Sequence, residues 1–171
     1  MKINVLFGLF FILFLSACDK SEYDLDNIVP PQYHKIMYIN NSGTHNVSLS
    51  TNQVDTFNIS IFKGGSQHEV SASVNLTVLS QEHVDSIYSE KDKVDYKVIN
   101  SDCYTLEPNH LEFSSADYYK VAKVLFNNQK VRQLIADNPN VNYVVPIGLS
   151  SANDLINADK SEVFLIVNDF N

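Results

Sequence analysis

The sequence predicts an all-β protein, an immunoglobulin-like β-sandwich of about seven to nine strands with one or two short helices. Short apolar runs alternate with polar residues at a period of two, which is typical of half-buried strands. Turn-forming residues interrupt these runs at irregular intervals. Helical periodicity is confined to short segments. The sequence contains no internal repeat and no low-complexity tract, which is consistent with a single domain.

The first predicted elements are a strand and a loop. Residues 36–39 (IMYI) form a short apolar run, as expected of a strand. Residues 40–46 (NNSGTHN) are polar and contain Gly43, so we expect a loop there.

The next two runs predict an antiparallel hairpin. Gly64 and Gly65 separate them and suit a turn that needs positive φ. Apolar residues occupy alternate positions on both sides of this turn: Phe57, Ile59 and Ile61 before it, and Val70, Ala72, Val74, Leu76 and Val78 after it.

Residues 80–93 change to helical spacing. Ser80 is a suitable N-cap, and Val84, Ile87 and Tyr88 follow at three- and four-residue intervals. A second short helix is expected within residues 128–138, ahead of Pro139.

The remaining segments predict strands. Pro146 has no N–H to donate to a ladder, so its strand is expected at a sheet edge or with a bulge. The closing run is apolar on both faces and is therefore expected to be central. The predicted strands lie within residues 96–108, 110–115, 117–127, 141–151 and 162–170.

The N-terminus predicts a lipoprotein signal peptide. Lys2 precedes about a dozen apolar residues, a length typical of a signal peptide and short for a membrane span, which needs roughly 20. The order Leu15-Ser16-Ala17-Cys18 resembles the bacterial lipobox, in which the cysteine is lipidated and becomes the first residue. Several acyl chains give lasting anchorage where one is marginal. The alternatives are an uncleaved anchor helix and an ordinary secretory signal with an incidental cysteine.

This assignment divides the chain into a signal peptide (1–17), a flexible acidic tether (18–34) and a β-sandwich domain (35–171). Without the signal peptide, 154 residues remain, with 11 basic and 20 acidic side chains and hence a net charge of −9. Such a surface argues against nucleic acid as a partner.

With Cys18 lipidated, Cys103 has no intrachain disulfide partner, and we expect it to be a small, partly buried strand residue. The five histidines lack the spacing of a helical zinc pair, and the sequence contains no nucleophile-elbow or phosphate-loop motif. We therefore expect no enzyme activity, no metal site and no cofactor.

Two weaker surface signals remain. Tyr118 and Tyr119 are a candidate ligand surface, because sugar sites use flat aromatic faces beside polar groups; the alternative is that they fill a core or an interface. Asp85-Ser86-Ile87 resembles the short sequon for O-glycosylation of exported Bacteroidetes proteins, with Ser86 as the acceptor; the alternative is an ordinary exposed helix surface.

Residues 35–168 resemble the domain of unknown function at the N-terminus of many Bacteroidetes surface lipoproteins. The acidic residues after Cys18 resemble the surface-export signal of these bacteria. The matching elements are the alternating strand, the short helix, Tyr104-x-Leu106-x-Pro108, Leu111-x-Phe113, Tyr143 to Ile147, and Ile156, Asn157, Lys160 and Ser161 before the last strand.

The resemblance implies an immunoglobulin-like sandwich on the outer face of the outer membrane. In the family this domain often precedes a lectin-like or glycoside-hydrolase domain and accompanies glycan-uptake systems. The resemblance offers no catalytic residues. The sequence ends at Asn171, so no second domain is expected in this chain.

We therefore expect a non-enzymatic outer-membrane surface lipoprotein for adhesion or accessory binding, with glycan capture as its role. The alternative is a structural spacer or cell-surface assembly subunit with no ligand of its own. The expected partners are the membrane, through the N-terminal lipid, and a polysaccharide or another surface protein.

Overall fold

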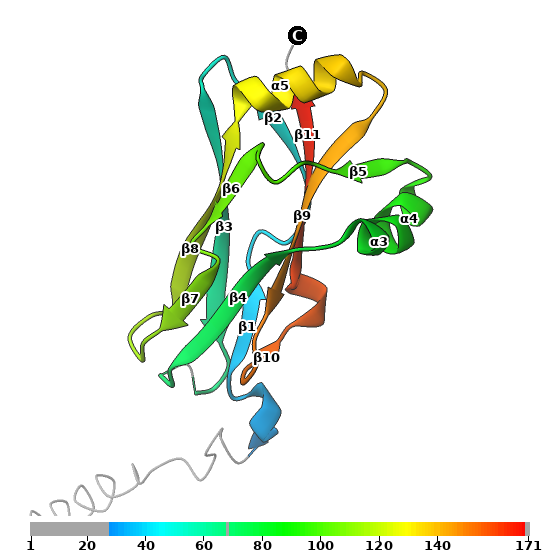
Figure 1. The fold of residues 1–171 in the computed structure, drawn as a ribbon. Helices are drawn as coiled ribbons and strands as arrows, with labels where there is room; N and C mark the ends of the chain where they lie inside the picture. Colours follow the sequence, from blue (N-terminus) through cyan, green and yellow to red (C-terminus); the bar gives the residue numbers. More distant parts are fainter. Residues whose placement is uncertain (1–27, 68, 170–171) are drawn as a thin grey trace, which may run out of the picture.

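Two β-sheets face each other in the computed structural model, which describes residues 28–67 and 69–169 (Figure 1). Sheet A has the strand order β10-β1-β3-β8-β6. Sheet B has the order β2-β11-β9-β4-β7, and β5 pairs with β9 beside this path. The predicted β-sandwich is thus confirmed.

The described residues form eleven strands, more than the seven to nine expected, because β2 begins in a predicted loop and β10, with two residues, is too short to show an alternating pattern. Sheet A contains β1 (Ile36–Ile39), β3 (Val54–Gly64), β6 (Tyr104–Glu107), β8 (Tyr119–Asn127) and β10 (Leu155–Ile156). Sheet B contains β2 (Gly43–Leu49), β4 (Ala72–Val78), β5 (Tyr96–Val98), β7 (His110–Phe113), β9 (Asn142–Ser150) and β11 (Glu162–Asp169).

The two predicted helices are also confirmed. The first consists of α3 (Gln81–Val84), the π-helical turn η2 (Asp85–Ser89) and α4 (Glu90–Asp92). Ser80 caps it by accepting a hydrogen bond from His83 N. The second is α5 (Asn128–Asp137), which begins at the end of β8. Two 3-10 turns complete the elements, η1 (Pro31–Tyr33) and η3 (Ala158–Lys160).

The inner faces of the two sheets form the main core. Its largest fully buried side chains include Phe113, Phe126, Met37 and Leu165. Val131 of α5 joins this core, so α5 closes the end of the sandwich at the top of Figure 1.

A second, smaller core explains why β9 and β11 are apolar on both faces. Val84 from the first helix packs with Tyr96, Val144 and Phe164 on the outer face of sheet B. The central position predicted for the closing strand is confirmed, because β11 lies between β2 and β9.

The predicted hairpin at Gly64-Gly65 is wrong. β3 pairs with β1 and β8 in sheet A, whereas β4 pairs with β7 and β9 in sheet B. The apolar faces of the two strands meet in the same core, and alternation reports only that one face is buried. Gly65 does have positive φ (107°), and a Cβ there would lie 2.3 Å from His34 O, so glycine permits a close backbone approach.

The loop predicted at residues 40–46 is also wrong, because most of it belongs to β2. This strand pairs in parallel with β11 through backbone hydrogen bonds at the edge of sheet B. Its side chains are mostly exposed or half-buried, with Leu49 alone of the strand fully buried, so no alternating apolar pattern marks it. Gly43 adopts a φ of 96° at the start of the strand, as a permissive residue can.

Pro146 does not mark an edge strand, because β9 lies inside sheet B. β5 pairs with β9 as far as Val144, and β4 pairs with it from Ile147 onward. Pro146 O accepts a hydrogen bond from Leu79 N on this side of β9. The nitrogen of Pro146, which carries no hydrogen, faces the same side as its carbonyl oxygen. On that side the partner of β9 changes from β5 to β4 at this position, so no regular ladder hydrogen bond is lost.

The sandwich begins close to the predicted boundary, with β1 starting at Ile36. Of the predicted tether, residues 28–34 have a defined structure that includes η1. The predicted signal peptide, Cys18 and the rest of the predicted tether lie outside the described residues.

Candidate functional site

Three aromatic side chains form a row across three neighbouring strands on the outer face of sheet A. Tyr38 of β1 pairs in register with Phe62 of β3, which pairs in register with Tyr119 of β8. Because Met37 and Ile61 next to them face the core, the row points away from it. We call Tyr38, Phe62 and Tyr119 the aromatic row.

The rings of the aromatic row stack on one another. The centroids of Tyr38 and Phe62 are 5.8 Å apart with planes at 23°. Those of Phe62 and Tyr119 are 5.4 Å apart with planes at 20°. Lys160 Nζ lies 5.3 Å from the centroid of Tyr38, within the range of a cation–π contact. The row therefore places three aromatic rings, two of them phenols, next to each other and beside the ammonium group of Lys160.

The aromatic row is open to solvent at the β8 end. Tyr119 is 58% exposed, and Phe62 and Tyr38 are half-buried. The helix that covers the smaller core lies on sheet B, on the other side of the sandwich (Figure 1). Sheet A thus presents its aromatic residues on a face that no helix of the described chain covers.

The two predicted ligand residues divide between two roles. Tyr119 belongs to the aromatic row, whereas Tyr118, 56% exposed, lies just before β8. Tyr118 O accepts a hydrogen bond from Lys63 N, which extends the β3–β8 pairing. Sequence reasoning missed Tyr38, Phe62 and Lys160, because only the strand register brings these distant positions together.

Lys63 is a buried cation beneath this end of sheet A. Its ammonium donates to Val70 O (3.0 Å) and Ser114 O (2.7 Å), and the residue is 4% exposed. Burial lowers the pKa of Lys63 below its ordinary value. Lys63 joins the β3–β4 and β7–β8 connections and does not face solvent as a ligand group would.

A hydrogen-bonded cluster lies beside the first helix. Glu162 Oε2 accepts from the Tyr88 hydroxyl at 2.7 Å and lies 3.1 Å from His83 Nε2. The Tyr88 ring stacks on Phe164 with centroids 3.9 Å apart. Burial and the bond to Glu162 raise the pKa of Tyr88 above its ordinary value. These contacts dock the helix on sheet B.

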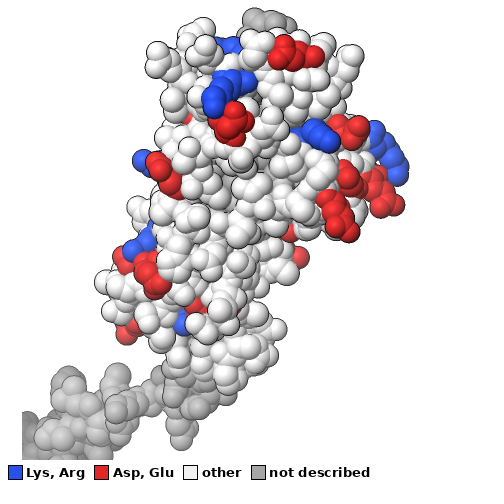
Figure 2. Space-filling model, in the orientation of Figure 1, with Lys and Arg blue, Asp and Glu red and all other residues white. Residues whose placement is uncertain are grey.

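The outer surface of the first helix is acidic. Figure 2 shows acidic side chains gathered at the right edge, where Figure 1 places α3 and α4. The exposed acidic residues of this helix are Glu82, Asp85, Glu90 and Asp92, and the exposed Lys91 lies among them.

Ser86, the predicted O-glycosylation residue, is exposed in the π-helical turn of this surface. Its hydroxyl donates to His83 O at 3.1 Å. The position is accessible to a modifying enzyme.

Cys103 is buried, as expected, but it lies in the turn before β6 and not in a strand. Burial raises the pKa of its thiol, which disfavours the reactive thiolate.

The described residues contain no group of three or more His, Cys, Asp and Glu side chains placed to hold a metal ion. Nor does any helix within residues 28–67 and 69–169 have the length and hydropathy of a membrane span.

The fold and the aromatic row define a class, a two-sheet sandwich domain with an uncovered aromatic sheet face. Residues 31–156 match the model of a family described as "-like, N-terminal domain". The chain belongs to this family of N-terminal domains. The resemblance expected from the sequence, to a Bacteroidetes domain of unknown function, is confirmed by this match and by solved structures from Bacteroides.

Solved structures share the fold at low sequence identity. A proposed carbohydrate-binding protein from Bacteroides ovatus has a TM-score of 0.62 and 19% identity, covering 77% of this chain and 36% of its own. A multidomain Bacteroides ovatus protein that includes DUF1735 has a TM-score of 0.56 and 17% identity, covering 80% of this chain and 45% of its own. The Bacteroides thetaiotamicron protein EndoBT-3987, solved with a Man5GlcNAc product, has a TM-score of 0.50 and 13% identity. The match covers 78% of this chain and 30% of EndoBT-3987.

This chain spans less than half the length of each of these three proteins. No curated protein sequence matches it.

Proposed function

We propose that this protein is a non-enzymatic, lipid-anchored protein of the outer-membrane surface that captures glycans as an accessory binding protein. The observation that carries the proposal is the aromatic row. Three stacked aromatic rings on an open sheet face, two of them with hydroxyl groups and one of them well exposed, place apolar surface beside hydrogen-bonding groups, the combination that sugar rings require.

The comparisons support the class of ligand. One protein with this fold is itself a proposed carbohydrate-binding protein, and EndoBT-3987 was solved with a glycan product. The family match names a domain and no reaction. The lipid anchor rests on the lipobox at Leu15 to Cys18.

Stacked cross-strand aromatic residues also stabilise sheets, by roughly 0.2–1 kcal/mol per pair. This purely structural role accounts for the stacking, but it does not require Tyr119 to be 58% exposed at the end of the row. The two roles differ in what the loss of Tyr119 does to ligand binding.

The test is affinity electrophoresis of the full-length chain in gels that contain mannan, xylan or starch. The wild-type chain is expected to be retarded by at least one of these polysaccharides. Tyr119→Ala is expected to weaken that binding about two- to tenfold, because an aromatic contact contributes about 0.5–1.5 kcal/mol beyond its area.

Ile87→Ala is the matched control, because Ile87 is a similarly exposed apolar residue on the first helix (50% exposed). It is expected to leave retardation unchanged. Equal retardation of wild type and Tyr119→Ala, or free migration of the wild type in all three gels, would contradict the proposal.

One observation favours the alternative, an assembly subunit. β2 is an edge strand of seven residues that pairs on one side with β11, and its other side is open in the described chain. Such an edge can accept a strand from a partner. Stoichiometric co-purification of one membrane protein, lost when Asn46→Pro removes a backbone donor from β2, would favour this function.

We also propose that Ser86 is O-glycosylated, on the strength of its sequon and its exposure. Intact-mass measurement of the protein from its own cells tests this. A mass excess that Ser86→Ala abolishes is expected, and an unmodified wild-type mass would refute it.

A further inference from the structure

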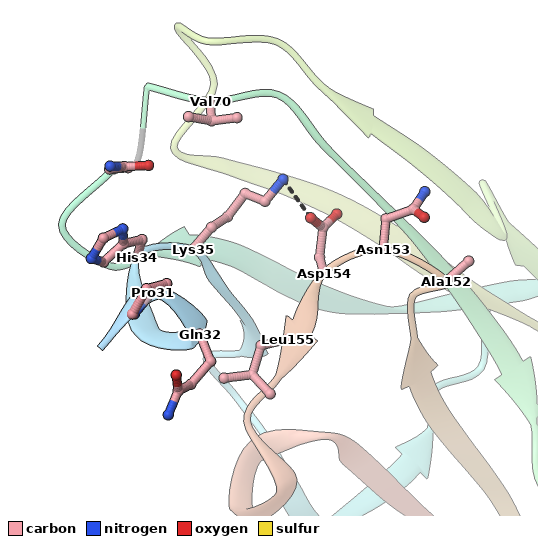
Figure 3. A pocket seen from close by; sticks show the side chains of 10 residues that line it. Pro31, Gln32, His34, Lys35, Val70, Ala152, Asn153, Asp154 and Leu155 are labelled. Atoms are coloured by element: carbon pink, nitrogen blue, oxygen red, sulfur yellow. Dashed lines mark ion pairs between the residues drawn. The ribbon is translucent and has the colours of Figure 1, made fainter. Parts of the chain in front are cut away.

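A cavity of about 640 Å³ opens at the end of the sandwich where the described chain begins. It lies between η1, the β3–β4 connection and the segment that joins β9 to β10 (Figure 3). Its volume is within the range of small-molecule sites. We call it the end pocket.

An ion pair forms the floor of the end pocket. Lys35 Nζ lies 2.5 Å from Asp154 Oδ1, and the two side chains point toward each other in Figure 3. The Asp154 side chain is 2% exposed, and its Oδ2 accepts from Ser73 N at 3.0 Å. Lys35 also donates to Ser71 O at 2.8 Å. The floor is therefore held in place from several strands, and its two charges balance.

The rim of the end pocket carries free hydrogen-bonding groups. The carboxamide side chains of Gln32, Gln67 and Asn153 line it. None of the three makes a hydrogen bond within the described chain, so each keeps two donors and an acceptor for a ligand. Lys35, with three N–H groups and two partners, retains one donor.

Apolar surface lies beside these amides. Val70 is 45% exposed and Leu155 is 40% exposed, and both line the end pocket. A ligand that fits must therefore offer both hydrogen-bonding groups and an apolar face.

We propose that the end pocket binds a single neutral pyranose unit, such as the end of a glycan chain. A sugar ring has hydroxyl groups around its edge for the amides and C–H faces for Val70 and Leu155. A purely apolar ligand would leave three amides without hydrogen bonds, which is costly. An anion gains little, because Asp154 already neutralises Lys35.

This site goes beyond the proposed function. The aromatic row extends over three strands and suits a chain that lies across them, whereas the end pocket offers space for one unit. The two sites use different residues, so each can fail without the other.

The experiment is an NMR titration of isotope-labelled full-length protein in mild detergent. The probes are methyl mannoside, methyl glucoside, methyl galactoside, N-acetylglucosamine and glucuronate. At least one neutral probe is expected to shift the side-chain amide signals of Asn153 and Gln67. Asn153→Ala is expected to weaken that probe's binding about tenfold, as the loss of one or more hydrogen bonds predicts.

Asn140→Ala is the matched control, an exposed asparagine between α5 and β9. It is expected to leave affinity unchanged, and so is Tyr119→Ala, which separates the end pocket from the aromatic row. Backbone spectra of each variant establish that it is folded.

Three results would overturn the proposal. The first is that no probe shifts the amide signals. The second is that glucuronate binds more tightly than every neutral sugar, which would define an anion site. The third is that Asn153→Ala and Asn140→Ala bind equally well.

Discussion

At the scale of single residues, Asp55 of β3 joins two distant parts of the chain at the end of the sandwich that α5 closes. Its carboxylate accepts hydrogen bonds from Ser50 Oγ (2.6 Å), Ser50 N (2.5 Å) and Asn128 Nδ2 (2.7 Å). The bonds from Ser50, with a smaller contribution from Asn128, hold the pKa of Asp55 below its ordinary value of 3.8. The sequence gives no sign of this cluster, because Asn128 follows it by more than seventy positions.

We predict that Asp55→Asn lowers the free energy of unfolding by about 1–2 kcal/mol, because it replaces a charged acceptor in a partly buried cluster. Since the folded-state pKa lies below the unfolded one, the contribution of Asp55 is fully present above pH 3.8 and is lost as the pH falls toward the folded-state pKa. Urea unfolding at neutral and acidic pH measures both effects.

In the Asp55→Asn variant, the loss of stability in that acidic window should be smaller than in the wild type. Asp95→Asn, at an exposed position, serves as the control and should stay within about 0.5 kcal/mol of the wild type. An unfolding free energy of Asp55→Asn equal to that of Asp95→Asn at neutral pH would rule out the stabilising role of the cluster.

At the scale of elements, sequence patterns identify most strands and both helices, but not their partners. β3 and β4 are next to each other in the sequence and carry the clearest alternation, yet they belong to different sheets. Burial of one face produces alternation whichever sheet a strand joins, so the pattern holds no information about pairing.

The same limit applies to the candidate site. The adjacent tyrosines Tyr118 and Tyr119 can be recognised in the sequence as a candidate ligand surface, and Tyr119 is indeed exposed. Its stacking on Phe62, and that of Phe62 on Tyr38, depends on the registers of β3 with β8 and of β1 with β3. A one-residue shift would turn an entire strand over, so the aromatic row can be recognised only after the sheet is known.

The docking of the first helix on sheet B allows a matched test within one element. Val84 is fully buried, whereas Ile87 is 50% exposed. Val84→Ala should lower the free energy of unfolding by about 1–3 kcal/mol, because it removes two methyl groups from the smaller core. Ile87→Ala should change it by less than about 0.5 kcal/mol.

Urea unfolding followed by fluorescence and circular dichroism compares the two variants. Similar midpoints for Val84→Ala and Ile87→Ala would mean that the helix contributes no buried contact to the stability of the sandwich.

At the scale of the whole molecule, the chain passes from one sheet to the other at almost every connection. Within the described residues, no two consecutive strands pair with each other, and only β4 and β5 are consecutive members of one sheet. The fold is thus built from contacts between distant segments. This topology explains why local signals predict the elements and the two-layer class but not the strand order.

The proposed anchor makes a prediction for the whole protein. Cys18→Ser should release the full-length protein from the membrane fraction, because it removes the acceptor of the lipid. Cys103→Ser is the matched control and should remain membrane-bound, since Cys103 is buried within the sandwich. Fractionation of cells followed by immunoblotting measures both.

Membrane retention of Cys18→Ser would exclude Cys18 as the anchor. Surface exposure is tested separately by adding protease to intact cells. Complete protection of the wild-type protein would place it on the inner side of the membrane.

The position of β11 between two partners has a mechanical consequence. The described chain begins at one end of the sandwich, and β11 runs toward the opposite end (Figure 1). A pull between these ends acts along β11, at right angles to its hydrogen bonds with the antiparallel β9 and across the slanted bonds to the parallel β2. Both ladders carry such a load in shear, with all bonds strained together and not opened one at a time. A domain pulled between the start of the described chain and the end of β11 would therefore resist extension at its last strand.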